Sequence, residues 1–348
     1  MNVISSTDLK NLQDNDPTAE SRKKDHIEMA FRSRITDLDS RFYYEPFLSA
    51  HPSKNPIPSF NFLNKTFRAP LWVSSMTGGT GQARNINKNL ARACGEFGFG
   101  MGLGSCRQIL YSDEFLEDFD VRHLTGNEVP LFANLGIAQI EKLFLQNDIF
   151  LIDELLKKLQ ANGLIVHINP LQEWLQPEGD RFLFPPIDTI KKLLNVADYP
   201  IIVKEVGQGF GPESIKALLQ LPLAAIDFAA GGGTNFAKLE LLRSSEEKQN
   251  VFNAVAGLGH SAEQMVNWTN EAYEKLQDKI QCQQIIISGG VQDFLDGFYL
   301  TQKIKMPAVY GQASSFLKYA QGDYAPLQKF ISSQLEGLSL AYAFLRVV

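Results

Sequence analysis

The chain has few of the residues that build disulfide-rich or zinc-binding proteins. Its 348 residues include only three cysteines, Cys94, Cys106 and Cys282, and no Cys-x-x-Cys pair. Disulfide frameworks and cysteine zinc sites both need paired cysteines, so the sequence predicts neither. This cysteine usage is typical of a reducing compartment, and we expect a cytoplasmic protein.

Long apolar runs and an excess of positive charge are also missing. No run approaches the roughly 20 apolar residues of a membrane-spanning helix, so no membrane span is expected. The polar start of the chain predicts no secretory or transit peptide. A net charge of −6 argues against a nucleic-acid-binding protein that works by bulk electrostatics. A local basic cluster could still bind a small anion.

Short apolar runs alternate with helix-like stretches along the chain. The runs are Leu71–Val73, Phe99–Leu103, Leu131–Ala133, Leu164–His167, Ile201–Val203, Ala224–Phe228, Ile285–Ile287 and Ala308–Tyr310. The helix-like stretches include 85–96, 149–160, 212–219, 261–276 and 292–304. This alternation predicts an α/β fold, a (β/α)₈ TIM barrel over residues 61–348, as a single domain with an N-terminal extension over 1–60. An open doubly wound sheet is the alternative, but the Gly-x-Gly-x-x-Gly spacing that would favour it is missing.

Polar residues follow nearly every predicted strand, and barrel enzymes carry their chemistry at these ends. Gly289 and Gly290 follow the seventh strand, and Gln312 and Ala313 follow the eighth. Barrels commonly bind phosphate at these two positions, because glycine lets backbone N–H groups approach the anion. Two ordinary strand-to-helix turns are the alternative. Together, the two turns favour a phosphorylated cofactor.

Lys204 follows the fifth predicted strand directly. It could be a Schiff-base nucleophile, a general base or a fixed charge beside an anionic ring, and spacing alone leaves the role open. An ion pair with Glu205 at the barrel rim is the structural alternative. Adjacent strand residues point to opposite faces, however, so we do not expect the two side chains to pair.

A basic cluster near the N-terminus contains Arg22, Lys23 and His26 and precedes a helix-like stretch at 27–34. Such a run is ordinarily a solvated face or a flexible arm, and composition alone favours that interpretation. The alternative is a basic arm that folds over an anionic substrate. Arg107, at the second strand end, could join it, since arginine binds phosphate oxygens bidentately.

The fourth predicted strand ends in His167-Ile-Asn169, with Gln172 and Glu173 on the loop that follows. His167 and Asn169 share one face of the extended strand. A single carboxylate among amides cannot form a zinc cage but suits Mg²⁺, which keeps waters and shares phosphate oxygens of a substrate. A core histidine and a solvated loop acid are the alternatives. The convergence of four such residues at one barrel mouth favours a reaction site.

Taken in order, these residues resemble the FMN-dependent type 2 isopentenyl-diphosphate isomerase family. The matching segments are Arg22–His26, Met76–Gly79, Gly104–Arg107, Ala133–Gly136, His167–Glu173, Gln176–Asp180, Val203–Gly207, Gly232–Phe236 and Ser288–Gly290. The blocks 167–173 and 176–180 are specific to the family, whereas single glycine pairs are not. The chain departs from the family pattern at 229–233 and 314–317, near the expected flavin edge and phosphate.

The resemblance implies an FMN across the barrel mouth and a diphosphate substrate beside it. The implied FMN contacts are Met76, Thr77, Gly78, Ser105, Asn134, Lys204 and Thr234, with the phosphate at Gly289, Gly290, Gln312 and Ala313. The implied substrate-binding residues are Arg22, Lys23, His26, Arg107, His167, Asn169 and Gln172. Catalytic roles are implied for Gln172, His167 and Lys204, and Glu173 would bind the Mg²⁺ that bridges to the diphosphate.

The implied reaction converts isopentenyl diphosphate into dimethylallyl diphosphate by a 1,3-allylic proton shift, a step of isoprenoid biosynthesis. The flavin must be reduced, usually by NADPH, and its N5 region would work as the acid and base. Protonating an alkene needs an acid beside carbon in a dry pocket, and the sequence has no ordinary pair of strong acids for that task. Lys204 would stabilise the anionic reduced ring. The resemblance also implies a homo-oligomer, a tetramer or octamer.

Three alternative functions fit the sequence less well. An FMN-dependent 2-hydroxyacid oxidase or dehydrogenase needs an Asn-His-Gly-x-Arg block late in the barrel, and the corresponding stretch 229–235 has neither histidine nor arginine. A nucleotide dehydrogenase would use a loop cysteine as nucleophile, but Cys106 is better explained as a small buried thiol. A non-catalytic flavin-binding barrel would be expected to have lost some of the residues between His167 and Glu173, and all of them are present.

Overall fold

The computed structural model describes residues 18–52, 57–75 and 81–348. The chain divides into two compact units, Met1–Phe42 with Val348 and Tyr43–Val347. In the first unit the described residues include helix α2 (Ala19–Met29). The second unit contains the barrel. The predicted division into residues 1–60 and 61–348 stays a prediction.

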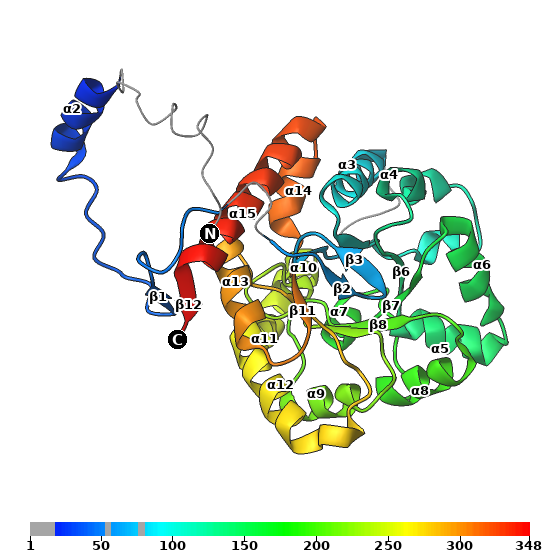
Figure 1. Cartoon of the computed structure of the whole chain (residues 1–348). Coiled ribbons are helices and arrows are strands. Elements are labelled where there is room, and N and C mark those ends of the chain that lie inside the picture. Colours follow the sequence, from blue (N-terminus) through cyan, green and yellow to red (C-terminus); the bar gives the residue numbers. More distant parts are fainter. Residues whose placement is uncertain (1–17, 53–56, 76–80) are drawn as a thin grey trace. The chain divides into compact units, whose positions relative to one another are not determined.

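Eight parallel strands close into a barrel in the order β10-β11-β4-β5-β6-β7-β8-β9 (Figure 1). They are β4 (Leu71–Val73), β5 (Gly100–Gly102), β6 (Leu131–Gly136), β7 (Gly163–His167), β8 (Ile201–Lys204), β9 (Ala225–Asp227), β10 (Ile285–Ser288) and β11 (Ala308–Gln312). The last strand closes the barrel on the first, with Gln312 opposite Val73. Each of the eight predicted apolar runs supplies one strand, so the predicted TIM barrel is confirmed.

Helices connect the strands and cover the barrel. They are α3 (Gly81–Phe97), α4 (Arg122–Thr125), α5 (Ile137–Gln146), α6 (Phe150–Leu159), α7 (Pro170–Leu175), α8 (Pro186–Val196), α9 (Pro212–Leu219), α10 (Phe236–Leu242), α11 (Glu246–Ala256), α12 (Ala262–Leu276), α13 (Phe294–Lys303), α14 (Ser314–Ala320) and α15 (Tyr324–Phe344). Among the described residues, 3₁₀ helices lie at Arg107–Ile109, Leu116–Asp118 and Gln277–Lys279. Small sheets in the same residues pair β1 (Phe42–Tyr44) with β12 (Leu345–Val347) and β2 (Phe60–Phe62) with β3 (Lys65–Phe67). No helix among the described residues has the length and apolar character needed to span a bilayer.

Local sequence signals explain where elements begin and how the strands pack. All six residues of β6 and all four of β8 are buried, as strands of a helix-covered parallel sheet require. The Asp293 carboxylate accepts the backbone N–H groups of Leu295 and Asp296 and caps the start of α13. Ser261 and Gln264 form a capping box at the start of α12. These caps fix two of the helices that follow barrel strands.

Glycine in β5 makes room for the largest core side chain. A Cβ atom at Gly100 would lie 2.4 Å from the Trp72 ring. Trp72 is fully buried and packs edge-on against Phe132, with the ring centroids 6.1 Å apart. Alanine at position 100 would overpack this core, at a cost of about 1–3 kcal/mol. Gly100 is therefore a packing requirement of the barrel.

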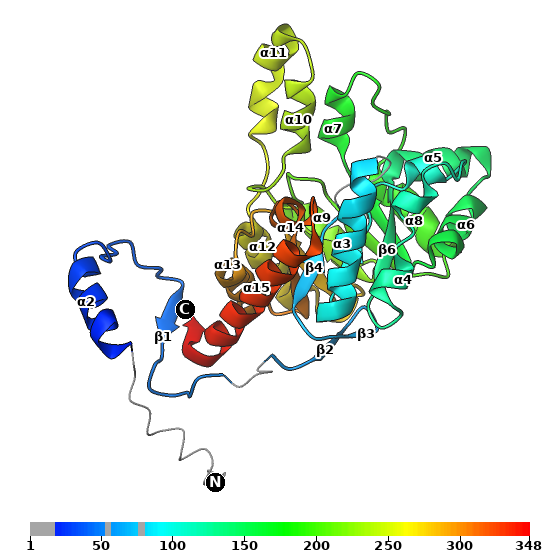
Figure 2. The same cartoon turned by 90° about the horizontal axis from the view of Figure 1, so that it is seen from above.

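Three helices that follow β7 and β9 pack together beyond the barrel strands. Figure 2 shows α10 and α11 projecting from the barrel, with α7 beside them. Their shared apolar cluster contains Leu175 of α7 and Ala237 and Leu241 of α10, all buried. Phe252 of α11 packs against this cluster. We call α7, α10 and α11 the cap.

Two local predictions are wrong. The basic cluster lies inside α2, which ends at Met29, and not before a helix at 27–34. Gln172 and Glu173 lie on helix α7 and not on a loop. Pro170 occupies the first turn of α7, where a proline loses no helical hydrogen bond. Pro170 is therefore compatible with this short helix.

Candidate active site

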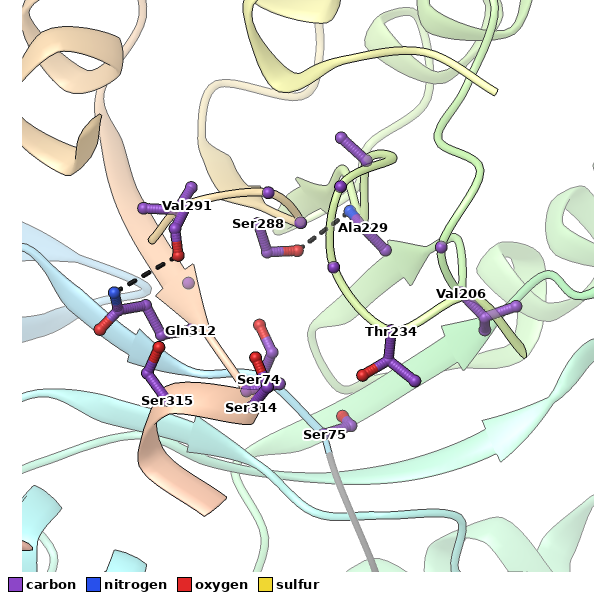
Figure 3. Close-up of a pocket in the computed structure, with 18 of the residues that line it drawn as sticks. Ser74, Ser75, Val206, Ala229, Thr234, Ser288, Val291, Gln312, Ser314 and Ser315 are labelled. Carbon is purple, nitrogen blue, oxygen red and sulfur yellow. Dashed lines mark hydrogen bonds between the residues drawn. The ribbon is translucent and has the colours of Figure 1, made fainter. Parts of the chain in front are cut away.

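A cavity of about 280 Å³ lies at the carboxyl ends of barrel strands (Figure 3). Its wall is built mainly from small residues and from hydroxyl or amide side chains: Ser74, Ser75, Gly207, Ala229, Ala230, Gly232, Gly233, Thr234, Ser288, Gly289, Gly290, Gln292, Gly311, Gln312, Ala313, Ser314 and Ser315. Lys204 contributes the cationic group. The predicted cofactor-binding residues in this wall are Lys204, Thr234, Gly289, Gly290, Gln312 and Ala313.

The turn after β10 runs so close to the end of β9 that only glycine fits there. Gly289 has φ +86°, and a Cβ atom on it would lie 2.1 Å from the carbonyl oxygen of Ala230. Gly290 has φ +72°, and its Cβ would lie 2.7 Å from the carbonyl oxygen of Gly231. Both the positive φ and the close approach exclude a side chain. The cavity wall is therefore bare backbone at this turn, as a close anion contact requires.

Several buried polar atoms in the cavity wall have no partner within the described part of the chain. They are Ser74 Oγ, Ser75 Oγ and Gln312 Oε1. The amide nitrogen of Gln312 does donate, to the carbonyl oxygens of Val291 at 3.4 Å and Gln292 at 3.2 Å. Buried polar groups in proteins are almost always hydrogen-bonded, so these atoms indicate a polar ligand. Together with the buried Lys204, the wall fits a phosphorylated cofactor.

Lys204 ends β8 between two other polar strand residues. It lies opposite His167 on β7 and Asp227 on β9. Its ammonium group donates to the carbonyl oxygen of Glu205 at 2.7 Å. The Glu205 carboxylate instead accepts the backbone N–H groups of Gly207 and two following residues, at 2.6–2.9 Å. Burial nevertheless raises the pKa of Glu205 above its usual value.

His167 is a neutral hydrogen-bonding group in this fold. Its Nδ1 lies 2.8 Å from Asn134 Oδ1, and the Asn134 amide nitrogen donates to the carbonyl oxygen of Leu103 at 3.0 Å. Asn134 Oδ1 is therefore an acceptor, and we assign the ring proton to Nδ1. Burial, and next the charge of Lys204, lower the pKa of His167 to about 3. His167 can therefore donate or accept near neutral pH but carries no charge.

The residues after His167 form a compact polar network on α7. The Asn169 amide nitrogen donates to Gln172 Oε1 at 3.2 Å and to Glu173 Oε1 at 2.9 Å. The other carboxylate oxygen of Glu173 accepts the backbone N–H of Asp180 at 2.6 Å. The Gln172 amide nitrogen reaches Glu240 of α10 at 3.4 Å. The structure thus brings Asn169, Gln172 and Glu173 together, and it leaves the buried Asn169 Oδ1 without a partner among the described residues.

Asp180 joins this network to a basic pair. Its carboxylate lies 3.3 Å from the Arg107 guanidinium and 2.5 Å from the Lys142 ammonium, and it accepts a hydrogen bond from Gln139 at 3.1 Å. Burial alone would raise the pKa of Asp180, but the hydrogen bond and charge of Lys142 and the charge of Arg107 lower it below the usual value. Arg107 therefore lies beside the α7 network as a half-exposed cation.

Comparison with known proteins places the chain. No family model matches it. Over 334 residues it is 32% identical to the isopentenyl-diphosphate delta-isomerase of Rickettsia africae (strain ESF-5), which covers 92% of this chain and 91% of the relative. Over 314 residues it is 34% identical to that of Rickettsia prowazekii (strain Madrid E), with 86% and 85% covered. The chain belongs to the isopentenyl-diphosphate delta-isomerase family.

Solved structures share the barrel of this isomerase-family chain. A mandelate oxidase with a monooxide FMN adduct matches with a TM-score of 0.53 and 11% identity, covering 88% of both chains. The recombinant flavin-binding domain of baker's yeast flavocytochrome b2 matches with a TM-score of 0.58 and 12% identity, covering 86% of this chain and 71% of the other. At these identities the likeness shows the fold alone.

The remaining predicted site residues of this isomerase-family chain lie elsewhere. Asn134 is buried against His167, outside the cavity wall, and Ser105 is solvent-exposed. Arg22, Lys23 and His26 lie exposed on α2, in the first compact unit. Met76, Thr77 and Gly78 lie outside the described residues. The structure therefore assembles two groups of predicted residues, one in the cavity wall and one on α7.

Several residues of the cavity wall and of the α7 network are missing from the predicted site, among them Ser74, Ser75, Asp180 and Glu240. Ser74 and Ser75 directly follow β4, so the rule that strand ends carry ligand contacts could have found them. Asp180 lies in the block 176–180, which the resemblance includes without giving Asp180 a role. Glu240 is almost fully buried on α10 and touches Gln172, a contact that depends on how the cap packs. No sequence pattern indicates that contact.

Glu173 fits the chemistry of a shared magnesium site. Within the described residues, no three His, Cys, Asp or Glu side chains gather to hold a metal ion. Glu173 is a nearly buried carboxylate, and Asn169 Oδ1 is an unpartnered oxygen beside it. Mg²⁺ takes oxygen ligands and commonly completes its shell with waters and substrate phosphate oxygens. The donor set fits an ion that binds together with a phosphorylated substrate.

Proposed function

We propose that this protein interconverts isopentenyl diphosphate and dimethylallyl diphosphate by a 1,3-allylic proton shift, using reduced FMN and Mg²⁺. The observation that carries the reaction is the relationship, over 92% of the chain, to a protein named isopentenyl-diphosphate delta-isomerase. The cavity at the strand ends supports the cofactor, and the α7 network supports the substrate side. When bound, reduced FMN supplies the acid and base for the proton shift.

The cavity wall would hold FMN by its phosphate and ring. The glycine turn at Gly289 and Gly290 would take the phosphate, and Gln312 Oε1, which has no partner among the described residues, would accept from a donor group of the cofactor. Lys204 would place a fixed positive charge next to the electron-rich reduced ring. Its ammonium group donates to a backbone carbonyl, and its charge also acts on the buried Asp227 carboxyl opposite it on β9. The buried Ser74 and Ser75 hydroxyls would bond polar atoms of the cofactor.

The α7 network would hold the diphosphate and its metal ion. Glu173 would bind Mg²⁺, and Arg107 would pair with diphosphate oxygens. His167 is neutral, with Nδ1–H committed to Asn134 and Nε2 left to accept, so it would line the substrate pocket and accept a hydrogen bond from a water, and would not bond the diphosphate oxygens directly. The basic residues Arg22, Lys23 and His26 of α2 are proposed to close over the diphosphate.

The chain would control the proton shift by orienting the substrate and excluding water. Gln172 is proposed to lie beside the reacting carbons, where a neutral amide cannot compete for the proton. Its amide nitrogen is held by Glu240, which fixes the direction in which its oxygen points. The cap helices would keep water away from the carbon atoms that gain positive charge when the alkene is protonated. His167 is too weak a base to act as an ionised acid near neutral pH.

An anaerobic assay tests the proposal. Purified protein is incubated with FMN, NADPH, Mg²⁺ and isopentenyl diphosphate, and dimethylallyl diphosphate is quantified, with a matched reaction that lacks FMN. We expect product only when FMN and the reductant are both present. A protein that binds FMN but forms no product under reducing conditions would contradict the isomerase proposal. Full activity in Gln172→Ala would remove the assignment of that residue.

NADPH as the reductant and assembly into a tetramer or octamer are also proposals, and both follow from the family. Anaerobic titration of the FMN-loaded protein with NADPH should bleach the visible absorbance band of the flavin. Light scattering should give a mass of four or eight chains. A monomer in solution would contradict the assembly.

A further inference from the structure

One fully buried carboxylate near the cavity has no role in the proposed reaction. Asp227 ends β9 with no exposed surface, and it is not part of the cavity wall. One carboxylate oxygen accepts the hydroxyl of Ser288, and the other has no partner within the described residues. Burial raises the pKa of Asp227 above its usual value. Burying a carboxylate with so few hydrogen-bond partners costs folding free energy, which indicates a specific role for Asp227.

Ser288 also forms hydrogen bonds with the backbone at the end of the neighbouring strand, β9. Its hydroxyl oxygen accepts the backbone N–H of Ala229 at 3.0 Å, a contact drawn in Figure 3. Its carbonyl oxygen accepts the backbone N–H of Ala230 at 2.8 Å. Because the hydroxyl proton is directed to Asp227, the oxygen lone pairs of Ser288 are left to face Ala229. Asp227 thus orients the hydroxyl that anchors Ala229.

Ala229 is the strained residue that this anchor holds. Its φ is +42°, in the left-handed region that a side chain disfavours and that glycine adopts freely. It is nearly buried and lines the cavity. The backbone directly after it packs against the glycine turn, since a Cβ at Gly289 would lie 2.1 Å from the Ala230 carbonyl oxygen and 2.3 Å from its nitrogen. A shift of Ala229 would therefore move the turn.

We propose that Asp227 and Ser288 are positioning residues for the cofactor phosphate. Ser288, oriented by Asp227, holds Ala229 in its left-handed conformation, and the Ala229–Ala230 backbone in turn fixes the Gly289–Gly290 turn. Neither the Asp227 carboxylate nor the Ser288 hydroxyl needs to touch the phosphate. The inference deepens the proposed function, because it depends on FMN binding at this turn.

Flavin binding to the apoprotein tests this inference without any turnover. Dissociation constants for FMN and for riboflavin, which lacks the phosphate, are measured by quenching of flavin fluorescence. In Ser288→Ala we expect FMN to bind about tenfold more weakly, as loss of one well-oriented hydrogen bond predicts, and riboflavin affinity to stay within about twofold. Ser339→Ala is the matched control, because it removes a buried hydroxyl of α15 that is bonded to Leu335.

A double-mutant cycle with Ala229→Gly tests the route of the effect. Glycine needs no anchor at φ +42°, so adding Ala229→Gly to Ser288→Ala should restore most of the lost FMN affinity. Ala229→Gly alone should bind FMN at least as tightly as the wild type. If Ser288→Ala does not fold, Ser288→Cys replaces it, because a thiol is a weak hydrogen-bonding group and the loss should have the same direction.

Three results would overturn the inference. They are unchanged FMN affinity in Ser288→Ala, an equal loss for FMN and riboflavin, and a loss that Ala229→Gly does not reduce. A wild-type protein that binds neither flavin would overturn the proposed function itself and the inference with it. Wild-type FMN binding followed by one of the three results would leave the proposed function in place.

Discussion

The two sides of the barrel mouth differ in how their polar groups are satisfied. Around the cavity, the buried oxygens of Ser74, Ser75 and Gln312 have no partner among the described residues, and the wall is fixed by backbone contacts and by the Ser288 hydroxyl, which accepts the backbone N–H of Ala229. On the α7 side nearly every polar group bonds another side chain, as Glu173 does with Asn169 and as Asp180 does with Arg107.

This difference separates two ways of preparing a binding site. The cavity is preorganised, because a ligand can fill it without breaking an existing hydrogen bond. The α7 side must exchange internal partners for ligand atoms, so binding there costs part of what the new contacts gain. We therefore expect the cofactor side to respond to changes of shape and the α7 side to respond to changes of charge.

Gly289→Ala should break the cavity side most strongly. A side chain there meets a positive φ, at about 1–2 kcal/mol, and a contact at 2.1 Å that overpacks the turn, at about 1–3 kcal/mol. We expect FMN affinity to fall by roughly 30-fold or more. Fluorescence titration of the apoprotein measures it.

Gly233→Ala is the matched control for this prediction. Its φ lies outside the positive region, and the nearest atoms to its Cβ would be 3.5 Å and 3.6 Å away, in ordinary contact. We expect FMN binding close to that of the wild type. Equal losses in the two variants would show that glycine at 289 is not required by its conformation.

Glu173→Gln should impair the proposed metal binding on the α7 side. The change removes the negative charge. It also replaces an acceptor oxygen by an NH₂ donor, which cannot accept the Asp180 N–H. The Mg²⁺ concentration for half-maximal isomerase activity should rise about tenfold, since a neutral amide is a poorer ligand for Mg²⁺. Glu178→Gln, on the same segment but with an exposed carboxylate, is the control. An unchanged Mg²⁺ requirement would exclude Glu173 as the ligand.

His167→Asn should alter how stability depends on pH. The pKa of His167 is about 3 in the folded protein and about 6.5 when unfolded, so below pH 6.5 only the unfolded chain takes up the proton. This stability is present above pH 6.5 and is lost as the pH falls toward 3. From pH 6.5 to 5.5 the wild type should lose roughly 1 kcal/mol more unfolding free energy than His167→Asn. The unfolding free energy is measured by urea denaturation at both pH values. Equal losses in the wild type and in His167→Asn would contradict a neutral His167.

Asp180→Asn should have the smallest effect of these variants, on anion affinity at the α7 side. It removes the carboxylate that competes with a diphosphate for Arg107 and Lys142, which are both half-exposed. Exposed ion pairs contribute about 0.2–1 kcal/mol, so inorganic pyrophosphate should bind roughly threefold more tightly at low salt. Calorimetry of the variant and of the Glu178→Gln control measures this. Weaker binding would mean that Asp180 positions Arg107 and does not compete for it.

The barrel and one side of its mouth could be predicted from sequence because both depend on local order. Each apolar run is long enough to cross the barrel, and the residue after it must emerge at the mouth. That rule found Lys204, Gly289 and Gln312, which line the cavity. The resemblance to a known family then supplied the chemical roles, and the family is confirmed.

What the sequence did not predict depends on contacts between distant segments. The bond between His167 and Asn134 needs the two adjacent strands in register, so composition cannot show that the histidine is neutral. The contact of Gln172 with Glu240 needs α7 to pack on α10. The short helix that carries Gln172 and Glu173 begins at Pro170, and the first helical turn accepts a proline.

The pairing of β11 with β4 has a consequence for folding during synthesis. The cavity wall combines Ser74 and Ser75, which follow the first barrel strand, with Gln312, in the last. A ribosome-bound chain that lacks β11 has two open sheet edges and only part of this wall. Such a nascent chain can aggregate edge to edge, and it cannot yet be stabilised by binding its cofactor. Flavin supply would then influence yield only after synthesis is nearly complete.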